Sequence, residues 1–88
     1  MGWKIKYLRS AKKGFARMDP AVRARIRRFL EQRVAAAENP RDYGKALVSP
    51  EQLWRYRVGD YRIICELRDK ELVVLVIRVA HRAKAYRE

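Results

Sequence analysis

Apolar and polar residues alternate over several stretches of the chain, and this period of two predicts β-strands. Residues 3–7 alternate apolar and basic side chains and predict a first strand. Two further alternating runs flank Gly59-Asp60, which predicts a hairpin with a two-residue turn. Residues 72–77 are apolar throughout, so they predict a strand that is covered on both faces and lies centrally in the sheet. A turn at Asp69-Lys70 would precede it.

A short helix is predicted after the first strand. Ala11, Phe15 and Met18 follow at helical spacing, and Ser10 is a residue type that commonly caps a helix N-terminus. Gly14 weakens this prediction because glycine is a poor helix former.

A second helix is predicted to begin at Asp19-Pro20, with Asp19 as the cap and Pro20 at the first helical position. Asn39-Pro40 would end it. Its apolar stripe, which is expected to face the core, consists of Val22, Ile26, Phe29, Leu30 and Val34. Arginines cover most of the remaining surface, where they either contact nucleic acid or keep the helix soluble.

Residues 39–52 contain Pro40, Gly44 and Pro50 and are predicted to form a loop. The order of elements is then βααβββ. This order predicts an α+β fold in which a small, mainly antiparallel sheet carries both helices on one face and leaves the other face free. A chain of 88 residues suits a single domain covering residues 1–88.

The chain is strongly basic, with 22 Lys and Arg against 10 Asp and Glu and a net charge of +12. Such a charge favours RNA, DNA or the ribosome as partner over a membrane surface. No apolar run is long enough to span a bilayer and no signal peptide opens the chain, so a cytoplasmic protein is expected. The single cysteine, Cys65, excludes an internal disulfide, and its place on the apolar face predicts a buried, inert thiol.

The hairpin gathers arginines on one face. Alternation directs Trp54 and Tyr56 toward the core and Arg55 and Arg57 to the other side. A two-residue turn would pair Arg57 with Arg62, and two like charges directly opposite each other repel. A fold tolerates such a pair most easily where an anion such as phosphate fits between the cations, although a solvated face with splayed arginines is the alternative.

No metal site, Ser/His/Asp triad or phosphate-binding glycine loop is recognisable. The remaining candidates for chemistry are Arg55, Arg57, Arg62, His81, Arg82 and Tyr86. Residues expected to contact RNA are Arg55, Arg57, Arg62, Arg78 and Lys84. These sets suit cleavage of RNA by attack of the 2′-hydroxyl on the neighbouring phosphate, a reaction that needs cations and proton carriers but no metal or other cofactor.

The segments 53–64 and 76–86 resemble the RelE toxins of the RelE/ParE superfamily, and the resemblance covers nearly the whole chain. It implies a ribosome-dependent endoribonuclease that cuts mRNA in the A site, held inactive by an acidic, RelB-like antitoxin. By motif, Arg55 and Arg57 fall where RelE proteins often carry catalytic lysines. Arg62 and Arg82 match the family's active-site arginines, and Tyr86 matches its C-terminal tyrosine, which orients or stacks on the mRNA.

Arginine at positions 55 and 57 departs from the family pattern, because arginine does not lose its proton and so cannot act as a general base. Histidine is the side chain best suited to proton transfer near neutral pH, so His81 is the candidate for that role, against the alternative of a purely structural role. Two other functions on the same fold stay open. One is a ParE-type inhibitor of DNA gyrase, and the other is an RNA-binding module without catalysis.

Overall fold

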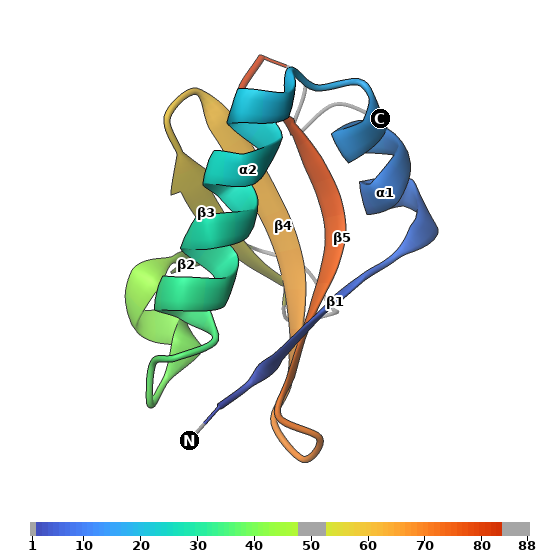
Figure 1. The fold of residues 1–88 in the computed structure, drawn as a ribbon. Helices are drawn as coiled ribbons and strands as arrows, with labels where there is room; N and C mark the ends of the chain where they lie inside the picture. Colours follow the sequence, from blue (N-terminus) through green and yellow to red (C-terminus); the bar gives the residue numbers. More distant parts are fainter. Residues whose placement is uncertain (1, 48–52, 84–88) are drawn as a thin grey trace.

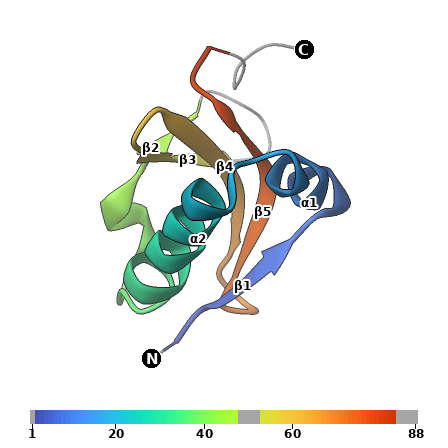
Figure 2. The ribbon, with the colours of Figure 1, turned by 45° about the horizontal axis from the view of Figure 1, so that its top comes forward.

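Two helices lie against one face of a five-stranded mixed sheet (Figures 1 and 2). The structure is a computed structural model that describes residues 2–47 and 53–83. In chain order the elements are β1 (Lys4–Tyr7), α1 (Arg9–Ala16), α2 (Pro20–Phe29), the π-helical turn η1 (Leu30–Val34), the 3-10 helix η2 (Pro40–Tyr43), β2 (Lys45–Ala46), β3 (Leu53–Val58), β4 (Tyr61–Arg68) and β5 (Val73–His81). The predicted α+β class and the placement of both helices on one face are confirmed.

The strand order is β1-β5-β4-β3-β2, so β5 is an interior strand between β1 and β4, whereas the middle position that the apolar run predicted for it belongs to β4. Strand β1 runs parallel to β5, and the other three pairs are antiparallel. The hairpin register is the predicted one, with Val58 opposite Tyr61 and Gly59 at a φ of 58° in the turn. The connection from β4 to β5 is longer than the predicted turn, because Arg68 pairs with Val73 and residues 69–72 all lie between the strands.

The core lies between the helices and the covered face of the sheet. Ala11 and Phe15 enter it from α1, and Ile26, Leu30 and Val34 enter it from α2 and η1. The sheet contributes Tyr56, Val58, Ile63, Cys65, Val74, Val76 and Val79. The predicted apolar stripe of the second helix is therefore confirmed, with Val22 and Phe29 partly buried at its margin.

Cys65 is fully buried in this core, as predicted. Burial raises the pKa of its thiol because the thiolate would lose its hydration. The thiol is consequently protonated and unreactive at neutral pH. Across the residues that the structure describes, no helix is long and apolar enough to cross a membrane.

The boundaries of both helices differ from the prediction. Ser10 lies inside α1 rather than at its cap; Leu8 precedes the helix without a side-chain cap, and the Ser10 hydroxyl donates instead to the carbonyl of Ile77, 2.6 Å away. Asp19 does cap α2, accepting a hydrogen bond from the backbone N–H of Ala21. The second helix ends at Val34 after its π-helical turn, earlier than predicted, and Asn39 caps η2 instead.

The predicted loop over residues 39–52 contains two short elements, η2 and β2, and residues 48–52 lie outside the described part. Two hydrogen bonds hold the element η2 against the covered face of β3. The hydroxyl of the fully buried Tyr56 donates to the carbonyl of Pro40 at 2.8 Å, and the indole N–H of the partly buried Trp54 donates to that of Arg41 at 3.2 Å. These bonds bring the chain that follows alongside β3, where Lys45 pairs with Arg55.

Gly14 fixes the distance between α1 and β5, which gives the first prediction. A Cβ at this position would lie 2.8 Å from the carbonyl oxygen of Val79, a backbone atom that cannot move aside cheaply. Gly14→Ala should therefore lower the free energy of unfolding, although alanine is the better helix former by roughly 1 kcal/mol. Denaturant titration of Gly14→Ala beside Gly2→Ala, whose added Cβ meets nothing within 4 Å, provides the comparison. A Gly14→Ala protein more stable than the wild type would contradict the close approach.

The buried hydroxyl of Tyr56 gives the second prediction. Tyr56→Phe keeps the ring in the core but leaves the Pro40 carbonyl without its donor. An unsatisfied buried acceptor costs about 1–3 kcal/mol, so the variant should unfold at lower denaturant concentration by that amount. Tyr43→Phe is the matched control because that side chain is 45% exposed. Equal stabilities of the two variants would show that the bond does not hold η2 in place.

Candidate nucleic-acid interface

The face of the sheet turned away from the helices carries a row of cations. Residues paired across neighbouring strands project their side chains to the same face. Lys45 on β2 pairs with Arg55 on β3, Arg55 with Ile64 on β4, and Ile64 with Arg78 on β5. Three positive side chains are therefore aligned across four strands, with one apolar side chain among them.

A β-bulge places Arg78 in this row. Cys65 pairs with Val76 but the preceding Ile64 pairs with Arg78, so Ile77 is an extra residue in β5. Val76 is buried in the core, and uninterrupted alternation would direct Arg78 to that same covered face. The extra residue reverses the alternation and turns Arg78 to the open face.

A second pair of cations lies nearer the hairpin turn. Arg57 pairs with Arg62, as the sequence predicted, and Arg57 is exposed while Arg62 is only 9% exposed. One nitrogen of the Arg62 guanidinium donates to the carbonyls of Gly59 and Tyr61, at 3.4 and 3.3 Å. Arg62 thus bends toward the turn, where carbonyl oxygens partly compensate its charge, and Arg57 is left to face solvent.

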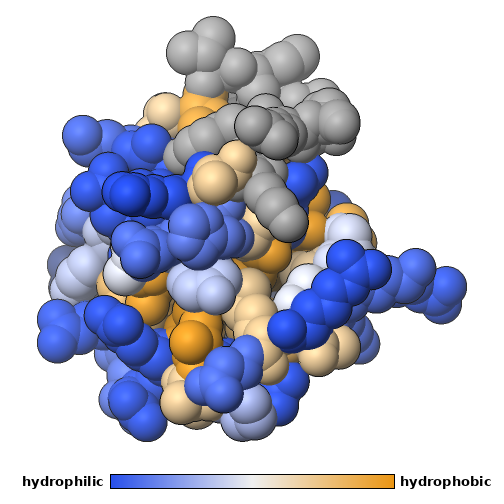
Figure 3. All heavy atoms as spheres, turned by 90° about the horizontal axis from the view of Figure 1, so that it is seen from above, coloured by the Kyte–Doolittle hydropathy of each residue, from blue (hydrophilic) through white to orange (hydrophobic). Residues whose placement is uncertain are grey.

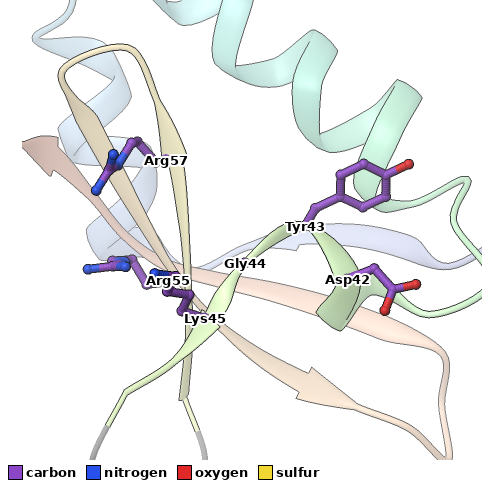
Figure 4. Close-up of a pocket in the computed structure, with 6 residues that line it drawn as sticks. All are labelled: Asp42, Tyr43, Gly44, Lys45, Arg55 and Arg57. Carbon is purple, nitrogen blue, oxygen red and sulfur yellow. The ribbon is translucent and has the colours of Figure 1, made fainter.

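A shallow cavity of about 290 Å³ adjoins these cations. It is lined by residues 42–45 together with Arg55 and Arg57. Lys45, Arg55 and Arg57 extend to one side of β2 and β3, whereas Asp42 and Tyr43 extend to the other (Figure 4). The acidic side chain therefore does not point among the basic ones.

Lys45 was not identified from the sequence as a candidate residue. It enters the row because β2 pairs with β3, and a two-residue strand produces too little alternation to be recognised. The closest signal in the sequence is Gly44. An added Cβ there would clash with the Arg55 carbonyl oxygen, so glycine is needed for the chain to approach β3.

Arg82 lies just beyond β5, beside the hairpin turn. Its backbone N–H donates to the carbonyl of Asp60 at 2.7 Å, and its side chain is exposed. The structure therefore brings Arg82 to the end of the sheet where Arg57 and Arg62 pair.

His81 lies on the other face. It pairs with Tyr61, which packs against the core, and the two rings meet edge to face with centroids 5.5 Å apart. The Nδ1 atom of His81 accepts a hydrogen bond from the backbone N–H of Ala83 at 3.2 Å, and the residue is exposed. The structure therefore separates His81 from the row that contains Arg55 and Arg78. The predicted site residues Lys84 and Tyr86 lie outside the described residues.

Figure 3 shows the end of the molecule that carries the hairpin turn and the start of α2. Hydrophilic side chains cover most of this end, and hydrophobic residues are visible in the gaps between these side chains. Because the whole chain has a net charge of +12, it attracts polyanions over a long range. Among the described residues, no three His, Cys, Asp or Glu side chains are grouped so that they could hold a metal ion.

Comparison with known protein families finds a match over nearly the whole chain. A family model described as the ParE toxin of the type II toxin–antitoxin system parDE matches residues 5–86. No curated protein sequence matches the chain.

Solved structures share the fold. The toxin–antitoxin complex RelBE2 from Mycobacterium tuberculosis matches with a TM-score of 0.83 and 22% identity, over 96% of this chain and 95% of that one. A double mutant of the E. coli toxin RelE in the free state matches with a TM-score of 0.78 and 25% identity, over 98% and 88%. The archaeal RelE–RelB complex from Pyrococcus horikoshii OT3 matches with a TM-score of 0.68 and 26% identity, over 97% and 100%.

Proposed function

The chain belongs to the ParE toxin family of type II toxin–antitoxin systems, and we propose that its activity is ribosome-dependent cleavage of mRNA in the ribosomal A site. The RelE toxins whose fold it shares belong to the same superfamily. The RelE-type activity is the better supported of the two that the superfamily offers, because of the side chains on the open face of the sheet.

The observation that carries this proposal is the row of cations across the open sheet face. Lys45, Arg55 and Arg78 are aligned by strand pairing, and Arg57 adds a further exposed guanidinium. Guanidinium groups bind phosphate oxygens in pairs through parallel N–H groups. A sheet fixes such groups more rigidly than a loop does, so they suit a phosphate that must be held in one orientation.

The proposed reaction needs no group from outside the RNA as nucleophile. The ribose 2′-oxygen bonds to the adjacent phosphorus, the bond from phosphorus to the 5′-oxygen breaks, and the products end in a 2′,3′-cyclic phosphate and a 5′-hydroxyl. The 2′-hydroxyl loses one proton and the leaving 5′-oxygen gains one. Negative charge grows on the phosphate oxygens between these states, and preorganised guanidinium donors stabilise it.

The arginines supply charge rather than proton transfer. Arginine stays protonated throughout the accessible pH range, so Arg55 and Arg57 cannot take the proton from the 2′-hydroxyl. His81 remains the proposed proton carrier, together with groups of the ribosome, and Tyr86 is proposed to orient the mRNA. Arg62 is proposed to shape the turn as well as to contact RNA, since its guanidinium already bonds to turn carbonyls.

The third prediction tests this activity with purified protein, programmed ribosomes and mapping of mRNA ends. The wild type should cut mRNA only when ribosomes are present. Arg55→Ala, Arg57→Ala and Arg82→Ala should each cut more slowly by about 10²–10³-fold under single-turnover conditions, the usual cost of removing one preorganised donor. Arg82→Ala keeps the backbone bond to Asp60 and so removes only the guanidinium.

The matched control is Arg28→Ala with Arg33→Ala, two exposed cations from the helical side of the chain. This double variant loses more charge than any single variant yet should cut at nearly the wild-type rate. If it slows cleavage as much as Arg55→Ala does, overall charge and not the open face controls the reaction, and the proposed site is wrong.

Inhibition of DNA gyrase is the second candidate. Two observations favour it: the matching family model describes a ParE toxin, and His81 lies on the opposite face from the row that contains Arg55. A supercoiling assay run beside the ribosome assay separates the two functions. Gyrase inhibition without any cut mRNA would replace the first proposal by the second.

The fourth prediction concerns an antitoxin. Two of the three solved structures named above are toxin–antitoxin complexes, and a chain of net charge +12 is proposed to bind an acidic, partly disordered antitoxin. Opposite charges accelerate encounter, and salt screens them over about 10 Å at 0.1 M. Stopped-flow association with the antitoxin encoded beside the toxin should therefore slow steeply as salt rises. A rate that does not change with salt would exclude electrostatic attraction as the driving force.

A further inference from the structure

A groove runs between α1 and the second half of β5. Strand β1 pairs only with residues 73–76 of β5, and α1 continues along the rest of that edge. The groove has a volume of about 560 Å³ and is lined by Ser10, Lys13 and Gly14 from α1, by Arg17 at the C-cap of that helix and by residues 77–80 from β5. Ser10 precedes Lys13 by three residues and Gly14 by four, and Arg17 follows them by four and three, so the four residues lie on one side of the helix and its C-cap.

Two fixed contacts define the groove. The Ser10 hydroxyl donates to the Ile77 carbonyl at 2.6 Å and ties the first turn of α1 to the bulge. Gly14 lets the helix approach the Val79 carbonyl more closely than a side chain would allow. The groove therefore rests on the same bulge that turns Arg78 toward the open face.

The ionisable side chains that line the groove, as far as the chain is described, are all basic: Lys13, Arg17 and Arg78. Lys13 and Arg17 are exposed, so their charge is available to a ligand. A neighbouring cavity of about 320 Å³ shares Gly14, Arg17 and two β5 residues with the groove and continues it toward His81. Its one acid, Asp19, is already engaged as the cap of α2.

Arg78 belongs both to the groove and to the cation row on the open face, because it lines the former and pairs through Ile64 with Arg55 in the latter. We propose that the groove between α1 and β5 is a second phosphodiester-binding subsite. It would receive the RNA strand where that strand leaves the open face, with Lys13 and Arg17 contacting backbone phosphates. This inference rests on the proposed function.

Such a subsite recognises backbone and not base sequence. Lysine and arginine contacts to phosphate add affinity, release counterions and carry no base information. Each phosphate contact on a single strand contributes about 0.7 to the slope of log affinity against log salt. Loss of two contacts should therefore reduce the magnitude of that slope by about 1.4.

The fifth prediction tests the groove with the full chain and a fluorescein-labelled oligouridylate that is long enough to reach both surfaces. Anisotropy titrations over a range of salt concentrations give the affinity and its slope. The double variant Lys13→Ala/Arg17→Ala should lose the expected part of the slope. The control is the double variant Arg9→Ala/Lys12→Ala, which removes the same charge from the same helix but outside the groove. This control should retain most of the wild-type slope.

Cleavage on ribosomes, measured in parallel, separates this inference from the proposed function. If the groove variant loses RNA affinity relative to its control while the wild type cuts no mRNA, the subsite stands and the nuclease proposal fails. If both double variants show equal affinities and slopes, or the wild type does not bind the oligouridylate, the subsite is overturned whatever the cleavage assay shows.

Discussion

The β-bulge at Ile77 is the constraint on which the surface chemistry of this protein depends. Strand β5 is an interior strand, so its register is fixed by pairing with β1 on one side and with β4 on the other. One extra residue in this strand keeps Val76 and Val79 both in the core, although simple alternation would place them on opposite faces. Arg78 then emerges on the open face. The Ser10 hydroxyl and the close approach at Gly14 hold α1 against this same segment.

A concentration of arginines on one sheet face is energetically unfavourable without a ligand, and the structure reduces the cost locally. Ile64 on β4 lies between Arg55 on β3 and Arg78 on β5, so these two arginines are not directly opposite each other. Two pairs of cations are directly opposed, Lys45 with Arg55 and Arg57 with Arg62. The second pair is relieved because Arg62 bends to the turn carbonyls. Like charges held in this way favour an anion between them, since a bound phosphate would remove the remaining repulsion.

Arginine at positions 55 and 57 separates charge stabilisation from proton transfer, two tasks that a lysine could combine. Arginine offers a planar pair of donors for phosphate but does not exchange its proton at physiological pH. A nuclease built on Arg55 and Arg57 must obtain proton transfer elsewhere, whereas a protein that only binds a polyanion or a target enzyme has no such need. The two proposed functions differ on this physical point, and they share the same fold.

The sequence by itself determined the elements whose signals are local and repeated. Alternation and the Gly59-Asp60 turn set the hairpin register, including the opposed Arg57 and Arg62, and the apolar run 72–77 identified a strand in the interior of the sheet. Helical spacing identified Ile26, Leu30 and Val34 as core. Signals shorter than one period were not recognisable, so β2 and with it Lys45 were missed. Only the tertiary structure decided the bulge, because an extra residue in an apolar strand leaves no mark in its composition. The bulge sets the face on which Arg78 lies and places His81 on the opposite face from Arg55 and Arg78. Its position depends on how β5 packs between its two neighbouring strands and against α1.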